Sequence, residues 1–107
     1  MLKTELQKGF MFASLDEGQL ERVAQHAVRI QLDEGEMLFQ QNDPAERFYL
    51  LLRGQVKLFR LGPSGNEKVI DIVTPVSTFA EALMFLDRPT YPVGAQAMQP
   101  VEVISID

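Results

Sequence analysis

Residues 33–58 of the chain, DEGEMLFQQNDPAERFYLLLRGQVKL, carry the alternation that decides the fold. Short runs rich in Leu, Phe, Tyr and Val are separated by Gly, Asn, Asp and Pro, the residues that turns require. Met37–Gln40, Arg47–Arg53 and Gln55–Leu61 each have the length of a strand and fall short of a typical helix. This stretch therefore predicts short β-strands joined by tight turns.

The same rhythm continues on both sides of this stretch. On the N-terminal side, Val28–Leu32 alternates apolar and polar residues, as a strand with one buried face does. On the C-terminal side, the predicted strands are Lys68–Val73, Val93–Met98 and Val101–Ile106. Many short strands at this spacing indicate a mainly β sandwich, barrel or jelly roll.

An N-terminal segment over residues 1–27 breaks this rhythm and predicts helix. Ser14 and Glu17 stand at the spacing of a capping box, in which each side chain bonds the backbone N–H of the other. Leu20 and Val23 then follow at helical spacing. We expect helices here that flank the β-structure.

A second interruption lies at residues 79–86, FAEALMFL, which contain good helix formers and no turn residue. A short helix over about 80–86 is expected between two strands. The free N–H groups at its start, near Ala80 and Glu81, could bind an anion. Alternatively, the helix is a plain connection that plugs the β-structure, and the pattern leaves both possibilities open.

Composition excludes several classes of function. The chain has 107 residues and a net charge of −5, so we expect one domain that does not bind DNA by itself. It has no cysteine, which excludes an iron–sulfur cluster or thiolate-bound zinc within it. No apolar run approaches a membrane span, and no signal peptide is visible, so a cytoplasmic location is expected.

Enzymatic chemistry is not indicated either. Neither a hydrolase triad nor a Walker-type loop is visible in the sequence, and we expect a protein that is not an enzyme. The single histidine, His26, cannot form a site that needs several imidazoles on one metal. It lies on the predicted N-terminal helix, where an exposed surface residue is the alternative to a metal ligand.

Gly35 and Gly54 at two turns, Asn42 at the turn between them, and the sequence Phe79-Ala80-Glu81 together resemble the cyclic-nucleotide-binding fold. Asn42 stands where the family has a second Gly, and Asn also adopts positive φ. The resemblance covers nearly the whole chain. It implies a mainly β fold with flanking helices, the double-stranded β-helix or jelly-roll barrel, with a helical segment over 1–27 and a sensor core over 28–107.

Within this fold the chain resembles transcription regulators of the Crp/Fnr superfamily. In such proteins the sensor domain is followed by a dimerisation helix and a helix-turn-helix domain, neither of which is present in these 107 residues. We therefore expect a domain from a longer, homodimeric regulator that reads DNA through its missing C-terminal part. A small effector would shift the regulator between inactive and active states.

The resemblance also locates the effector pocket. It implies the nine residues Phe79, Ala80, Glu81, Leu83, Met84, Phe85, Arg88, Tyr91 and Pro92.

In cyclic-nucleotide-binding relatives a Glu binds the ribose, and an Arg-Ser pair binds the cyclic phosphate. Glu81 matches the Glu, but Tyr91 stands at the Arg position and Pro92 at the Ser position. This exchange removes the cation and several hydrogen-bond donors that a buried phosphate needs. Cyclic nucleotide binding is therefore not expected, although Arg88 could replace the missing cation by bending toward the helix start.

The segment from Thr78 to Pro92 resembles the nitric-oxide-responsive Dnr/Nnr branch of the superfamily, which senses through haem. The resemblance implies a haem- and nitric-oxide-responsive sensor that controls denitrification or anaerobic genes. An apolar pocket containing Leu83, Met84 and Phe85 suits a flat macrocycle better than a phosphate. The alternatives are a true cyclic AMP or cyclic GMP domain, and a degenerate β-domain that serves only as an interaction module.

Overall fold

The computed structural model describes residues 16–107, with the backbone alone for Ala82 and Met84. Its elements are α2 (Glu17–Gln25), β1 (Ala27–Leu32), β2 (Met37–Phe39), β3 (Phe48–Arg53), β4 (Val56–Leu61), β5 (Glu67–Val73), β6 (Thr78–Phe79), the 3-10 helix η2 (Glu81–Phe85), β7 (Gly94–Ala97) and β8 (Val101–Ile106). The expected helix before Ser14 lies outside the described residues. Within them, no helix is long and apolar enough to cross a bilayer.

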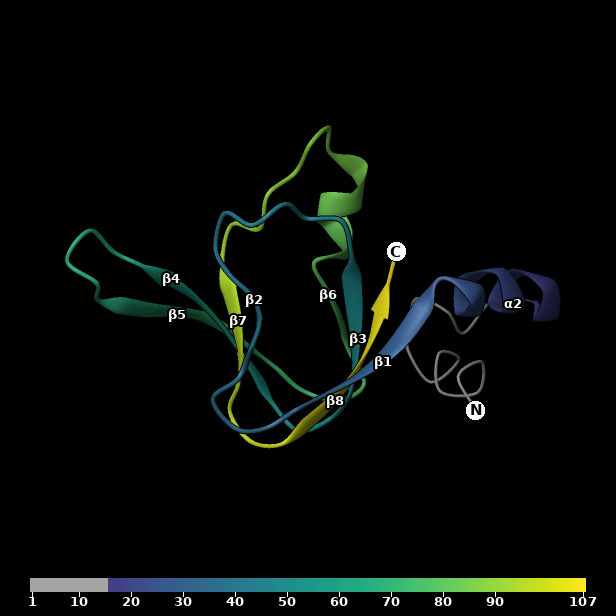
Figure 1. Ribbon diagram of the computed structural model, residues 1–107, viewed down its shortest axis with the longest axis horizontal. Helices are drawn as coiled ribbons and strands as arrows, with labels where there is room; N and C mark the ends of the chain where they lie inside the picture. Colours follow the sequence, from purple (N-terminus) through teal and green to yellow (C-terminus); the bar gives the residue numbers. More distant parts are fainter. Residues whose placement is uncertain (1–15) are drawn as a thin grey trace.

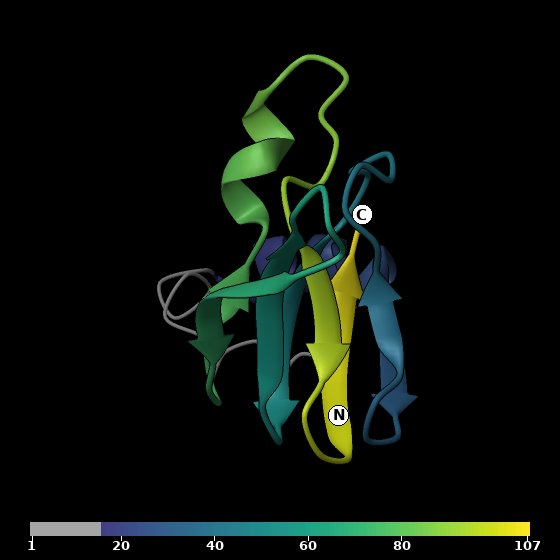
Figure 2. The ribbon, with the colours of Figure 1, turned by 90° about the vertical axis from the view of Figure 1, so that its left-hand side faces the viewer.

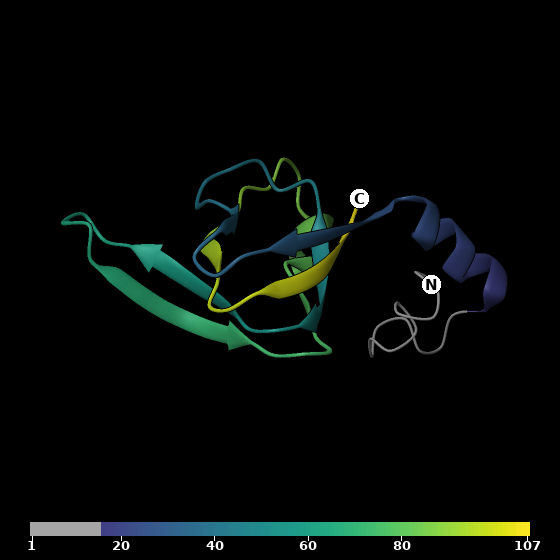
Figure 3. The same cartoon turned by 60° about the horizontal axis from the view of Figure 1, so that its bottom comes forward.

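The strands form two four-stranded antiparallel sheets, in the orders β1-β8-β3-β6 and β2-β7-β4-β5 (Figure 1). The mainly β jelly-roll fold is confirmed, although the sheets do not close into a barrel. The β4–β5 hairpin extends away from the remainder of the structure (Figures 1 and 3). All seven predicted strands are present, and β6 was not predicted because two residues carry no detectable period.

Two hydrophobic clusters lie on opposite faces of the first sheet. Val101 and Val103 of β8 belong to the cluster enclosed between the sheets. Ile104 and Ile106 pack instead with Leu20 of α2 on the outer face. Every residue of β8 is buried, because β8 lies between β1 and β3 and has a hydrophobic cluster on each face.

The start of α2 corrects one expectation. The helix begins after Asp16, whose carboxylate accepts a hydrogen bond from the backbone N–H of Gln19 at 2.8 Å. The Gln19 side chain in turn accepts from the backbone N–H of Asp16 at 3.1 Å, which completes a capping box. The box was thus assigned two residues too early, because Asp and Gln cap as well as Ser and Glu do. Glu17 is the first helical residue.

The short helix is also smaller than expected. It is one turn of 3-10 helix, and it lies with the following loop at one end of the sheets (Figure 2). So few aligned peptide groups give almost no helix dipole, which favours the alternative of a plain connection over an anion site at its start.

Three turns adopt the backbone conformation that the motif requires. Gly35, Gly54 and Asn42 have φ angles of 89°, 87° and 75°. The expectation that Asn42 tolerates positive φ is therefore confirmed. Gly54 is the most constrained of the three, because a Cβ atom there would lie 2.5 Å from the carbonyl oxygen of Pro100.

Candidate functional site

A pocket of about 170 Å³ opens between β2, β4, β6, η2 and the loop before β7. Its lining is formed by Phe39, Leu58, Phe79, Ala80, Leu83, Tyr91, Pro92 and Val93. None of these eight side chains carries a charge at neutral pH. The pocket can therefore bind a ligand through apolar and aromatic contact.

An aromatic cluster forms the inner part of this pocket. The rings of Phe39 and Tyr91 are stacked, with centroids 3.8 Å apart and planes inclined by 15°. Tyr49 stacks on Phe39 at 5.5 Å and on Phe79 at 5.3 Å. Such ring pairs stabilise a core beyond the area that they bury. The cluster makes the inner part of the pocket rigid and flat.

Tyr91 is held at both its backbone and its hydroxyl group. Its N–H donates to the carbonyl oxygen of Asp43 at 3.0 Å, and its own carbonyl accepts from the N–H of Asn42 at 2.8 Å. Its hydroxyl donates to the carbonyl oxygen of Arg47 at 2.8 Å and lies 3.3 Å from the hydroxyl of Tyr49. The only polar group on a lining side chain is therefore already engaged in the protein.

Tyr49 remains a neutral phenol in this network. Its burial, together with the hydrogen bond that its hydroxyl donates to Tyr91, raises the pKa of Tyr49 above its ordinary value of 10.0. A negative charge at this hydroxyl would be unfavourable in the interior. The polar network thus adds no charge to the pocket.

Five of the nine expected site residues line this pocket: Phe79, Ala80, Leu83, Tyr91 and Pro92. Glu81 is half-buried but is not among the lining residues. Phe85 differs from the expectation, because it is 88% exposed. On a single 3-10 turn, Leu83 packs against the core and Phe85 reaches solvent.

Cations lie at the margin of the pocket. Arg88, the expected substitute, is exposed on the loop after η2 and is not among the lining residues. The guanidinium that reaches the rim belongs to Arg60 of β4, whose Nε donates to the carbonyl oxygen of Pro92 at 3.1 Å. No local sequence pattern indicated this contact, because Arg60 and Pro92 are far apart in the chain.

Three lining residues were also not expected: Phe39, Leu58 and Val93. They come from β2, from β4 and from the residue just before β7, and strand pairing brings them together. Their alternation within strands indicated burial, but not which cavity they would line.

The pocket offers no iron ligand among the side chains described. Its lining includes neither an imidazole nor a thioether. His26 is exposed at the C-terminal end of α2, and α2 packs on the outer face of the first sheet. Among residues 16–107, no group of three or more His, Asp or Glu side chains is placed to hold a metal ion.

Ala80 adopts a strained conformation at the edge of the pocket, with φ 67° and ψ 4°. A left-handed conformation costs a non-glycine residue about 1–2 kcal/mol. Glycine avoids this cost but loses about 0.5–1 kcal/mol more chain entropy on folding. The backbone at this position therefore favours glycine.

Replacing Ala80 with glycine is expected to raise the free energy of unfolding by about 0.5–1 kcal/mol, because relief of strain exceeds the entropy loss. Urea denaturation measures the difference. The control is Ala24→Gly in α2, which should lower the same quantity by about 1 kcal/mol. A loss of stability in both variants would show that Ala80 is not strained.

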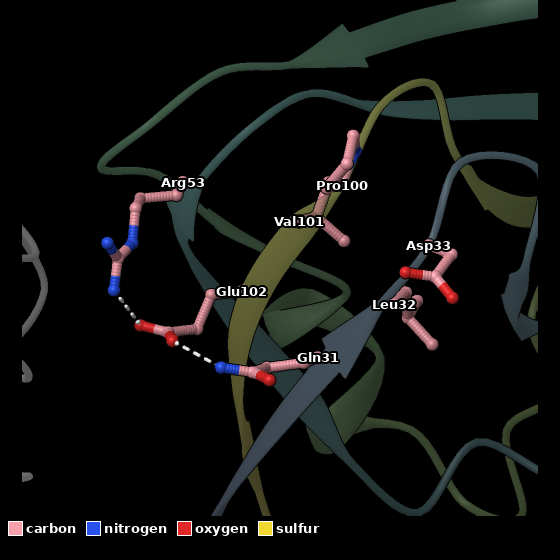
Figure 4. A pocket seen from close by; sticks show the side chains of 7 residues that line it. All are labelled: Gln31, Leu32, Asp33, Arg53, Pro100, Val101 and Glu102. Carbon is pink, nitrogen blue, oxygen red and sulfur yellow. Dashed lines mark hydrogen bonds and ion pairs between the residues drawn. The ribbon is translucent and has the colours of Figure 1, made fainter.

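A second cavity, of about 330 Å³, lies where β1, β3 and β8 meet (Figure 4). Glu102 lies at its edge and is only 6% exposed. Its Oε1 accepts from Arg29 at 2.8 Å and from Arg53 at 3.1 Å, and its Oε2 accepts from Gln31 at 3.1 Å. Both carboxylate oxygens are thus satisfied, which indicates a structural clamp across three strands.

Replacing Glu102 with glutamine is expected to lower the free energy of unfolding by about 2 kcal/mol at neutral pH, because two guanidinium groups lose their carboxylate. The hydrogen bond from Gln31, followed by that from Arg53, holds the pKa of Glu102 below its ordinary value of 4.5. Its stabilisation is therefore present above pH 4.5 and is lost as the pH falls through the lower folded-state pKa.

The difference in the free energy of unfolding between the original chain and Glu102→Gln should accordingly shrink as the pH is lowered from neutral to below 4.5. Denaturation series at several pH values measure it, with the exposed Glu46→Gln as the control that changes little. A difference in free energy of unfolding that stays constant over this pH range would contradict a stabilising charge on Glu102.

Known proteins resemble this chain in sequence and in structure. The model of a family described as cyclic nucleotide-binding domain matches residues 29–107. A global nitrogen regulator from Synechococcus elongatus is 34% identical over 107 residues, which are 99% of this chain and 46% of that protein. A CRP-like cAMP-activated global transcriptional regulator from Mycobacterium tuberculosis is 24% identical over 102 residues, which are 95% of this chain and 45% of that protein.

Among solved structures, the sensor domain of the transcriptional regulator DNR from Pseudomonas aeruginosa is similar, with a TM-score of 0.90 and 38% identity. The match covers 97% of this chain and 69% of that one. The chain thus spans about half the length of these two curated relatives and most of a separately solved sensor domain.

Proposed function

The chain belongs to the cyclic nucleotide-binding domain family, in the form found in Crp/Fnr-type regulators, and on that premise we propose that it senses an uncharged, apolar effector for a bacterial transcription regulator. DNA would be read by a separate domain of the parent protein. The net charge of −5 supports this division, because non-specific DNA binding needs a positive surface.

One observation carries the proposal: among the residues that the structure describes, the pocket where a cyclic nucleotide would be bound has no cation in its lining. A buried phosphate needs a paired guanidinium and several donors to offset its lost hydration. Tyr91 contributes a ring that is only 3% exposed, and its hydroxyl donates a hydrogen bond to the carbonyl oxygen of Arg47. Pro92 contributes neither a hydroxyl nor an N–H.

The alternative, a working cyclic nucleotide site, draws support from the cAMP-activated relative and from Arg60 at the rim. Arg60 is exposed, however, and its Nε is already bonded to the carbonyl of Pro92. A guanidinium exposed to water attracts an anion far more weakly than a desolvated guanidinium does. We therefore favour an uncharged effector.

For the finer function we propose a regulator of the Dnr/Nnr branch that responds to nitric oxide and controls denitrification or anaerobic genes as a homodimer. The likeness to the DNR sensor domain supports this assignment at the level of the branch. The apolar lining supports an uncharged effector in general.

The branch resemblance implies haem. The apolar lining of this pocket suits a haem macrocycle, but the pocket volume and the lack of described iron ligands do not. Pockets for drug-sized ligands occupy about 300–1,000 Å³, whereas this one has about 170 Å³. None of the described lining side chains supplies an imidazole or a thioether, and His26 lies outside the pocket. The described side chains therefore give no basis for a haem-dependent step.

A haem titration tests the finer proposal. Stoichiometric binding with a shifted Soret band, lost in the variant His26→Ala, would support haem sensing with that imidazole as ligand. Without a Soret shift the haem assignment is wrong, and the proposal of a small apolar effector stands. On the parent protein, effector binding should change DNA affinity in a mobility-shift assay, and unchanged affinity would contradict the sensing role.

A further inference from the structure

We propose that the pocket selects a single uncharged aromatic ring, which rests on the proposed sensing of an uncharged, apolar effector and names its class in place of nitric oxide. The first argument is size. An apolar cavity of about 150 Å³ holds one benzene molecule, and this pocket has about 170 Å³. A monocyclic ring fits that space, whereas a purine riboside or a macrocycle would extend beyond it into solvent.

The second argument is polarity. Seven of the eight lining side chains are hydrocarbon, and the hydroxyl of the eighth, Tyr91, already donates to the carbonyl of Arg47. A charged substituent on the ligand would lose its hydration without gaining a partner. The pocket therefore discriminates against a carboxylate on the same ring.

The third argument is shape. Phe39, Phe79 and Tyr91 supply three rings to the lining, and the first and last are stacked with nearly parallel planes. Ring pairs in offset or edge-to-face contact gain energy beyond area burial. An aromatic ligand therefore gains more here than an aliphatic ring of equal size.

Titrations of the chain with toluene, methylcyclohexane and benzoate, followed by amide chemical shifts in NMR spectra, test this selectivity. With toluene we expect saturable shifts confined to Phe39, Leu58 and residues 79–93, which contain all the lining residues. Methylcyclohexane should bind at least several-fold more weakly, and benzoate should give no saturation. Equal binding of benzoate, stronger binding of methylcyclohexane, or absence of saturable toluene shifts would overturn the proposal.

Val93→Phe should fill the pocket and abolish the toluene shifts, because the added ring occupies the ligand volume. Leu83→Phe is a second filling variant, should the first fail to fold. The matched control is Leu61→Phe, at an exposed position outside this pocket, which should retain toluene binding. Retained binding in a folded filling variant, or loss of binding in the control, would contradict the site.

These outcomes separate the inference from the function on which it rests. If toluene fails and cyclic AMP also fails, the inference is wrong while a different apolar effector remains the proposed function. If cyclic AMP binds with saturation at Tyr91 and its neighbours, the proposed function itself is wrong.

Discussion

Gly54→Ala is expected to lower the free energy of unfolding by about 4 kcal/mol, because strain and overlap add at this one position. Its φ angle of 87° is unfavourable for alanine. The new Cβ would lie 2.5 Å from the carbonyl oxygen of Pro100 and 2.6 Å from Cγ1 of Val101. The nearest of these atoms belongs to the backbone, so the turn between β3 and β4 would have to move.

Gly35→Ala is the matched control for this prediction. Gly35 has nearly the same φ angle, 89°, and no atom lies within 4 Å of its virtual Cβ. We expect a cost of about 1 kcal/mol from strain alone. Urea denaturation of the two variants measures both effects, and equal losses would show that the close approach to Pro100 does not constrain the fold.

Tyr91→Ala is expected to lower the free energy of unfolding by about 4 kcal/mol, since it removes a ring that is 3% exposed and stacked on Phe39. Tyr91→Phe keeps the ring and removes only the hydrogen bonds of its hydroxyl with the carbonyl of Arg47 and the hydroxyl of Tyr49. Its expected cost is about 1 kcal/mol.

The comparison of these two variants in denaturation experiments separates ring packing from hydrogen bonding. A loss in Tyr91→Phe as large as in Tyr91→Ala would assign the stability to the hydroxyl network with Tyr49 and Arg47. It would also remove the reason for regarding Tyr91 as the apolar wall of the pocket.

Much of the fold was predictable because strand alternation and turn chemistry act locally. Val28–Leu32 and Val101–Ile106 were assigned from period and residue type, and both are strands of the first sheet. The positive φ of Asn42 was predictable because asparagine, unlike most residues other than glycine, tolerates this conformation. The start of α2 was misplaced because Ser14 and Asp16 are both good caps, and local sequence does not choose between them.

The candidate site was predictable only where one segment builds it. Phe79, Tyr91 and Pro92 lie in the stretch that carries the family resemblance, and the structure places all three at the pocket. Phe39 and the rim contact of Arg60 depend on pairing between distant strands, which no local pattern records. The ion pairs of Glu102 could not be predicted for the same reason, because their partners come from the distant strands β1 and β3.

Calorimetric titration of the chain with cyclic AMP and cyclic GMP tests most directly whether this pocket has lost the means to bind a cyclic phosphate. Because Tyr91 and Pro92 supply neither charge nor free donors, we expect no saturable heat with either nucleotide. One-to-one binding at micromolar concentration, reduced by Arg60→Ala, would contradict this account and would assign the phosphate to the guanidinium at the rim.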